Sequence, residues 1–165
     1  MSVDMKLISK PINEELRYLD DLFKSAMKSK VNMIDQISKF ILKQKKKKIR
    51  PVLTLLSAKT CGQITDSSYR AAMMVELLHT ATLVHDDVVD NADTRRGYAS
   101  VNAIWKNKVA ILIGDYFLSR GLMICVDGND YKTLGITSNA VNRMSEGELL
   151  QIQKSKQLDI DEKVY

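Results

Sequence analysis

The chain has 165 residues, of which 45% are hydrophobic and 27% are charged, and its formal net charge is +5. This length and composition suit one packed domain and exclude a disordered chain. Two prolines and seven glycines are too few for a loop-rich or all-β fold. The cysteines, Cys61 and Cys125, form no CxxC motif. They fit a reducing cytosol better than a disulfide scaffold.

The positive charge is concentrated in one segment. Residues 39–50, KFILKQKKKKIR, carry seven positive charges and no negative charge. Because the net charge of the whole chain is +5, the rest of the chain carries −2. A lysine run is usually a solvated face. No aromatic residue interleaves the lysines for base stacking, so a nucleic-acid binder is a weak alternative and we expect no nucleic-acid partner. The N-terminal residues 1–10 lack the apolar core of a signal peptide, and no run approaches the roughly 20 apolar residues of a membrane span. We therefore expect a cytoplasmic protein.

Helical periodicity dominates the first part of the chain. Apolar residues at three- and four-residue steps predict a first amphipathic helix through Ile12, Leu16, Leu19, Phe23 and Met27. A second helix is predicted over residues 31–42. The next segment begins at Pro51 and ends before Gly62, which is the placement expected at the start and just past the end of a helix.

Two longer segments, residues 67–91 and 101–126, are apolar on nearly every face, as is typical of central buried helices. Gly114 and Gly121 lie inside the second one and indicate close packing or a nearby ligand, because glycine costs a helix interior about 1 kcal/mol relative to alanine. Residues 130–156 predict a further amphipathic helix. No segment alternates strictly, so the predicted class is all-α.

The C-terminal residues LDIDEKVY resemble a helix start, with Asp159 as N-cap and Glu162 three residues later. A helix of so few residues is marginal alone. We therefore expect the sequence to belong to something longer, with a frayed tail as the alternative.

An acidic cluster closes the segment 67–91. If it is helical, Asp86 and Asp90 are i and i+4 on one face, about 6 Å apart at Cβ, and Asp87 flanks them. Carboxylates at a helix C-terminus oppose the helix dipole, so three acids there need a cation. Because Mg²⁺ prefers oxygen ligands and uses one or two carboxylates with substrate phosphates, the cluster predicts Mg²⁺ holding a phosphorylated ligand.

Two sets of cations accompany this cluster. Arg95 and Arg96 follow Asp90 by five and six residues, and guanidinium groups bind phosphate oxygens in a bidentate manner. The run KKKKIRP supplies a second anion site. Two such sites among apolar helices indicate two diphosphates with apolar tails.

Taken together, ELLHTATLVHDDVVDNADTRRG resembles the first aspartate-rich region of trans-isoprenyl diphosphate synthases, DDxxD followed by RRG. KKKKIRP is similar to the GGKRxRP motif of that family, and IGDYFLSRG is similar to its GDY helix. The resemblance covers nearly the whole chain and is strongest to the long-chain, octaprenyl-type (polyprenyl) branch. It implies the N-terminal portion of the all-α isoprenoid synthase bundle.

The resemblance also assigns roles to residues. Asp86 and Asp90 would bind Mg²⁺ that bridges the allylic diphosphate, with Asp87 assisting and Arg95 contacting that diphosphate. Isopentenyl diphosphate would be held by the other polar residues: Lys47, Arg50, His79 and Arg96. Gln151 matches a helix position that faces the metal site in the family, and His85 would be structural. The implied reaction is a magnesium-dependent prenyltransferase condensation, which serves isoprenoid and quinone side-chain biosynthesis.

Product length would depend on the residues one to two turns before Asp86. Bulky aromatic residues there stop elongation in the family, so the small Ala81 and Thr82 imply a longer product, while Leu78 narrows the tunnel. The resemblance further implies a homodimer of the full-length protein, with peripheral membrane contact for product release.

The sequence also departs from the family. Lys45 and Lys46 replace two glycines, so the diphosphate loop differs. By the resemblance, we expect residues 1–165 to be an incomplete polyprenyl synthase domain, without the C-terminal half that carries the second aspartate-rich motif, and we expect the chain alone to be inactive. A non-catalytic or regulatory subunit of a heteromeric synthase is the alternative. A terpene cyclase is disfavoured, because a cyclase needs no site such as Lys47, Arg50 and Arg96.

Overall fold

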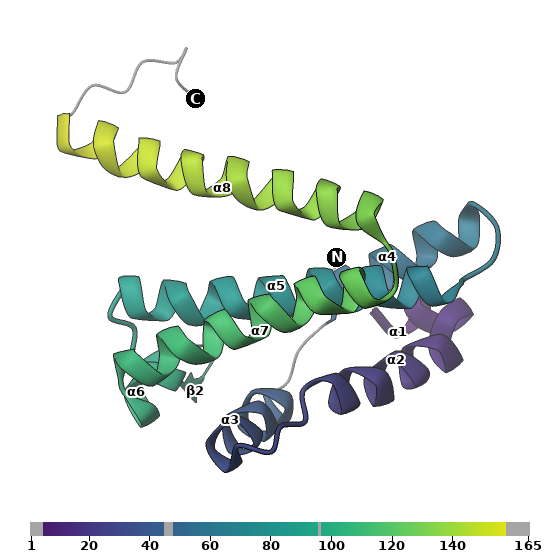
Figure 1. Cartoon of the computed structure of the whole chain (residues 1–165), viewed down its shortest axis with the longest axis horizontal. Coiled ribbons are helices and arrows are strands. Elements are labelled where there is room, and N and C mark those ends of the chain that lie inside the picture. The colour runs from purple at the N-terminus through teal and green to yellow at the C-terminus, as the bar shows by residue number, and fades with distance from the viewer. Residues whose placement is uncertain (1–4, 45–47, 96, 158–165) are drawn as a thin grey trace. The chain divides into compact units, whose positions relative to one another are not determined.

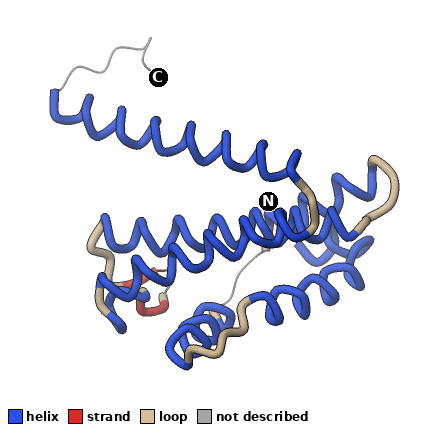
Figure 2. Tube along the Cα trace, viewed as in Figure 1, coloured by secondary structure: helices blue, strands red, loops and turns tan. Residues whose placement is uncertain are grey.

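The computed structural model describes residues 5–44, 48–95 and 97–157. The chain divides into two compact units, Met1–Asn129 and Asp130–Tyr165. The predicted C-terminal helix start at Asp159 lies outside the described residues. Nearly all of the described residues are helical, which confirms the all-α class (Figures 1 and 2).

The first unit holds most of the elements: α1 (Met5–Ser9), the 3-10 helix η1 (Lys10–Ile12), α2 (Asn13–Ala26), α3 (Asn32–Lys43), α4 (Ile49–Thr60), α5 (Asp66–Val89), β1 (Thr94–Arg95), β2 (Tyr98–Ala99), α6 (Val101–Trp105) and α7 (Asn107–Asp127). The described part of the second unit forms one helix, α8 (Tyr131–Gln157). The predicted helices over residues 31–42, 67–91 and 130–156 therefore match α3, α5 and α8 closely. The short antiparallel pair β1–β2 was not predicted from the sequence; two residues a strand are too few to show alternation.

Helices α5 and α7 lie side by side along most of their length (Figure 1). Three glycines, two in α7 and one at its C-cap, face residues of α5 whose order along the chain is the reverse of their own. Gly114 faces His85, Gly121 faces Met74 and Gly128 faces Arg70. A Cβ at Gly121 would lie 2.8 Å from Met74 Sδ. The two helices are therefore antiparallel, and the glycines serve the close packing that the sequence indicated.

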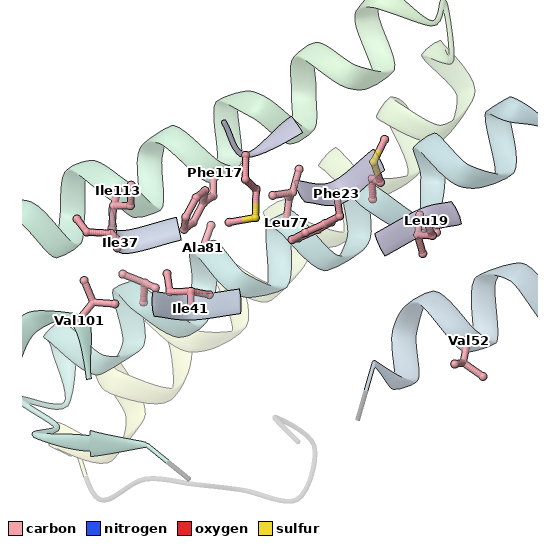
Figure 3. Close-up of a cluster of buried hydrophobic side chains, with 14 of the residues drawn as sticks. Leu19, Phe23, Ile37, Ile41, Val52, Leu77, Ala81, Val101, Ile113 and Phe117 are labelled. Atoms are coloured by element: carbon pink, nitrogen blue, oxygen red, sulfur yellow. The ribbon is translucent and has the colours of Figure 1, made fainter. Parts of the chain in front are cut away.

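The hydrophobic core of the first unit is built by the facing sides of α2, α3, α5 and α7 (Figure 3). Helix α5 contributes buried side chains from Ala72 in its second turn to Asp87 in its last turn, as expected for a central helix apolar on nearly every face. The labelled members of this cluster include Leu19, Phe23, Ile37, Ile41, Leu77, Ala81, Ile113 and Phe117. The stripe predicted for residues 12–27 is confirmed, since four of its five members are buried: Ile12, Leu19, Phe23 and Met27.

The segment predicted as one helix over 101–126 is two helices, α6 and α7. The chain breaks at Lys106, whose φ of 73° and ψ of 160° end α6 and precede α7. Ser100 caps α6 by accepting a hydrogen bond from the Ala103 N–H at 3.3 Å. Because α6 is anchored to the loop after α5, the chain must turn before α7 can run back along α5.

Helix α4 starts at Ile49, two residues before the predicted Pro51. Gly62, with φ of 147°, follows its end as predicted. Lys59 ties α4 to the N-terminal helices by donating to Glu15 Oε1 at 2.9 Å and to the Pro11 carbonyl at 2.6 Å. This hydrogen bond from Lys59 lowers the pKa of the Glu15 carboxyl.

Trp105 of α6 packs edge-to-face on Phe40 of α3, with ring centroids 5.2 Å apart.

Helix α7 meets the length and hydropathy criteria for a membrane span, with a mean hydropathy of 1.7, contrary to the expectation that no segment would. Phe117 and Gly121 of this helix are buried in the first unit.

Candidate functional site

The three aspartates at the end of α5 do not share one environment. Asp86 and Asp90 are exposed, whereas Asp87 is only 4% exposed. Successive residues of an α-helix point about 100° apart. Asp86 and Asp90, at i and i+4, therefore share one face of the helix, and Asp87 points to a different face. Within the described residues, the carboxylates of Asp86 and Asp90 make no hydrogen bond or ion pair.

Asp87 is held by an arginine from the hairpin that follows the helix. Arg95 Nε donates to Asp87 Oδ1 at 2.6 Å, and the Arg95 side chain is 30% exposed. Arg95 lies on β1, which pairs with β2 through Arg95 and Tyr98. Gly97, with φ of 81°, lies in the turn between the strands, a conformation that glycine adopts at no steric cost. The structure thus joins two residues predicted for the site, Asp87 and Arg95, to each other.

A network of polar contacts fixes the loop between α5 and α6. Asn102 Nδ2 donates to the Asp87 carbonyl at 3.2 Å and to the Ala92 carbonyl at 3.1 Å. Ser100 Oγ donates to the same Ala92 carbonyl at 2.6 Å. Sequence reasoning missed Ser100 and Asn102, although a serine directly before an apolar helical turn is a usual N-cap signal. Their effect is to hold the backbone of Asp87 as well as its side chain.

The space on the Asp87 side is small. The cavity lined by Thr80, Asp87, Arg95 and Ser100 has a volume of about 40 Å³. One water needs about 10–15 Å³ of such space, so this cavity has room for a few waters but not for a diphosphate. Any larger ligand would therefore have to approach from the exposed side, where Asp86 and Asp90 lie.

The structural role predicted for His85 agrees with its surroundings. Its Nε2 lies 3.2 Å from the Ile111 carbonyl and 3.4 Å from Asp115 Oδ1. A Cβ at Gly114 would lie 2.2 Å from the same Nε2, so the imidazole fits only because residue 114 is glycine. His85 thereby links α5 to α7 one residue before the aspartates.

Only part of the basic segment is described. Lys47, Lys45 and Lys46 lie outside the described residues, as does Arg96. Lys48 adopts φ of 47° before α4, and its Nζ makes a salt bridge with Asp20 of α2. Arg50 is exposed in the first turn of α4.

The remaining predicted residues lie on two helices. On α5, His79, Leu78 and Thr82 are half-buried, while Ala81 is buried in the core cluster. Leu78 and Thr82 precede Asp86 by eight and four residues, so they continue its face of the helix, and Ala81 faces the core instead. Gln151 is exposed on α8, in the second unit.

The residue set at the end of α5 fits a magnesium ion better than a zinc ion. Among the described residues there is no group of three or more His, Cys, Asp or Glu side chains that could hold a metal. Mg²⁺ needs fewer protein ligands, since it keeps several waters and takes its other oxygens from substrate phosphates. Asp86 and Asp90, exposed and without a side-chain partner in the part of the chain that the structure describes, meet that requirement.

The family is established by the match of residues 31–165 to the polyprenyl synthetase family model. The chain belongs to the polyprenyl synthetase family and has the all-α fold of isoprenoid synthases, which confirms the resemblance and its implied fold.

Individual relatives support this membership. The chain is 36% identical, over its whole length, to the all-trans-nonaprenyl-diphosphate synthase (geranyl-diphosphate specific) of Rhodobacter capsulatus, of which it covers 51%. It is 37% identical to the octaprenyl diphosphate synthase of Escherichia coli (strain K12), with 84% of this chain and 43% of that protein aligned. The structure of this chain superposes over its whole length on half of the polyprenyl synthase from Caulobacter crescentus CB15, with a TM-score of 0.91 and 31% identity. The chain thus spans about half the length of the relatives it matches.

Proposed function

We propose that this chain provides the allylic diphosphate site of a synthase that condenses an allylic prenyl diphosphate with isopentenyl diphosphate. The observation that carries the proposal is the difference in surroundings among the three aspartates at the end of α5. Asp86 and Asp90 are exposed and have no partner in the described part, while Asp87 is held by Arg95. The related polyprenyl synthase of Caulobacter crescentus was solved in complex with calcium and isoprenyl diphosphate, which supports a cation-bridged diphosphate.

Asp86 and Asp90 would hold Mg²⁺, which when bound would neutralise charge on the leaving diphosphate. Asp87 would contribute in a different way from a direct ligand. Its carboxylate orients Arg95, and Asn102 holds its backbone carbonyl. Arg95 would then meet the allylic diphosphate with a fixed geometry, which is the preorganised electrostatic stabilisation that transition states need.

The apolar part of α5 would receive the growing chain. Thr82 and Leu78 continue the face of Asp86 and are half-buried, so a prenyl tail would pass along them away from the aspartates. Apolar walls would exclude water from the reacting allylic group. The buried Ala81 would act on product length only indirectly, through the packing beside Thr82.

Isopentenyl diphosphate would be bound by Arg50 and His79, together with Lys47 and Arg96. The role of Gln151, on α8, stays a prediction from the resemblance to the family. Homodimer formation, peripheral membrane contact and a cytoplasmic location remain part of the same proposal, by the resemblance to the family. A non-catalytic subunit is not favoured, because both exposed carboxylates are retained.

The proposal is tested by binding of farnesyl diphosphate to this chain, measured by calorimetry with excess Mg²⁺ and with EDTA. Binding should require Mg²⁺ and should be lost in Asp86→Asn and Asp90→Asn. Asp93→Asn is the matched control, because Asp93 is an exposed aspartate of the same loop. Binding that is the same in EDTA, or that survives both substitutions, would contradict the proposal.

A radiolabelled isopentenyl transfer assay tests catalysis separately. We expect this chain alone to give little or no turnover with Mg²⁺. Turnover comparable to that of complete synthases would overturn that expectation while leaving the binding proposal intact.

A further inference from the structure

A groove runs between the end of α2 and the length of α3, away from the aspartates. Its volume is about 340 Å³. Its wall combines apolar side chains with the stems and ammonium groups of lysines from both helices. The lining residues are Lys24, Met27, Lys28, Asp35, Ser38, Lys39, Leu42 and Lys43.

The charge around the groove is not balanced. Four lysines and one aspartate line it. Lys39 pairs with Asp35 at 2.6 Å, and Lys24 pairs with Asp21 at 2.9 Å. Lys28 and Lys43 make no ion pair within the described residues. Two of the four ammonium groups therefore remain available to an anion.

The helix dipoles offset only part of the positive charge around the groove. Lysines near a helix C-terminus are stabilised by a partial charge of roughly −0.5 per helix end. The ends of α2 and α3 together thus offset about one positive charge. Asp35 and Asp21, which pair with Lys39 and Lys24, offset two more, so a surplus of about one positive charge remains at the groove. That surplus favours an anionic head group over a neutral one, and the ammonium groups of Lys28 and Lys43 suit the several acceptor oxygens of a phosphate monoester.

The floor of the groove suits an apolar chain. Met27 is buried there, and Leu42 is 38% exposed although it is apolar. The hydroxyl of Ser38, also in the wall, is buried and has no hydrogen-bond partner among the described residues. Lys24 and Leu42 also line a second cavity of about 250 Å³, so a linear tail could continue past them. Leu19, Phe23 and Ala72 supply the apolar lining of that second cavity.

We propose that this groove binds a single-chain amphiphile with a phosphate head and an alkyl or isoprenyl tail. Lys28 and Lys43 would contact the head, and Leu42 with the stems of Lys24 and Lys39 would cover the tail. The occupant is a free molecule and not a bilayer, because the groove is a trough between two helices and not a flat basic face.

The probe is dodecyl phosphate below its micelle concentration, titrated into the chain in EDTA so that a metal-dependent diphosphate site is silent. Dodecyl phosphate should bind, and inorganic phosphate and dodecanol should each bind at least tenfold more weakly. The double variant Lys28→Gln/Lys43→Gln should weaken binding about tenfold, since charge-assisted contacts of this kind each contribute a few-fold or more. The control Lys10→Gln/Lys108→Gln removes two exposed lysines elsewhere and should leave the affinity unchanged.

Three outcomes would overturn the proposal. The first is equal affinity of the groove variant and the control variant, with far-UV circular dichroism showing that both are folded. The second is loss of binding in Arg50→Gln but not in Lys28→Gln/Lys43→Gln, which would assign the anion to the basic segment. The third is binding to vesicles with an anionic phospholipid surface but not to dissolved dodecyl phosphate, which would make this a membrane contact. None of these outcomes bears on Mg²⁺-dependent binding at Asp86 and Asp90.

Discussion

The ion pair between Asp87 and Arg95 is expected to stabilise the fold as well as to shape the site. At a charge separation of about 4 Å and an effective dielectric constant of about 20, the gross attraction is about 4 kcal/mol. Desolvation of Asp87, which is 4% exposed, and the partial exposure of Arg95 offset part of this. We therefore expect a net coupling energy of about 1.5–3 kcal/mol.

A double-mutant cycle measures this coupling: Asp87→Asn, Arg95→Gln and the two together, each unfolded in urea and followed by far-UV circular dichroism. Arg95→Gln should be the more destabilising single change, because it leaves a buried carboxylate without its partner. The double variant should recover part of that loss. The matched control is the exposed pair Lys24 and Asp21, whose coupling should be near the detection limit. If the coupling of Asp87 with Arg95 is no larger than that of the control pair, the reasoning fails.

Three further substitutions have clear expected outcomes in urea unfolding. Gly114→Ala should destabilise by about 1–3 kcal/mol through overpacking against His85, despite the better helix propensity of alanine. Lys106→Gly should stabilise by about 1 kcal/mol or more, because its backbone conformation is essentially restricted to glycine. Lys59→Gln should destabilise at about pH 7 but much less at about pH 3. The hydrogen bond from Lys59 lowers the pKa of Glu15 from 4.5, so its contribution is present above that value and lost as the pH falls through the lowered one.

Each of these has a control that separates the stated cause from a general effect. A Cβ at Gly147 of α8 meets nothing within 4 Å, so Gly147→Ala should cost no stability. Lys108→Gly places glycine in the first turn of α7 at a residue without positive φ, and it should therefore give no stabilisation. Lys24→Gln removes an exposed lysine from another ion pair. Its effect on the free energy of unfolding should change much less between about pH 7 and about pH 3 than the effect of Lys59→Gln. The opposite sign for Lys106→Gly, or parallel pH profiles for the two lysine variants, would contradict the respective explanations.

The helices could be predicted from sequence because their cause is local. The spacing of Leu19, Phe23 and Met27 already places them on one face, and the three-dimensional structure buries that face. The break at Lys106 could not be predicted in this way. Lysine has no preference for positive φ, and the turn follows from contacts of α6 with the loop after α5, such as that of Asn102 with the Asp87 carbonyl.

The candidate site was predictable in part. Helical geometry alone separates Asp87 from the pair formed by Asp86 and Asp90. The partner of Asp87 was not predictable, because Arg95 reaches it only after a hairpin reverses the chain. Roles for Lys47 and Arg96 stay predictions, since those residues lie outside the described part.

The packing of Trp105 on Phe40 provides an optical reporter built into the protein. Trp105 is the only tryptophan of the chain, so its emission needs no labelling to be assigned. It belongs to the short helix whose Asn102 holds the backbone of Asp87, and its ring rests on α3. Any ligand that shifts the loop after the aspartates should therefore change the wavelength or polarisation of this single fluorophore, which gives a real-time record of site occupancy in the unmodified chain.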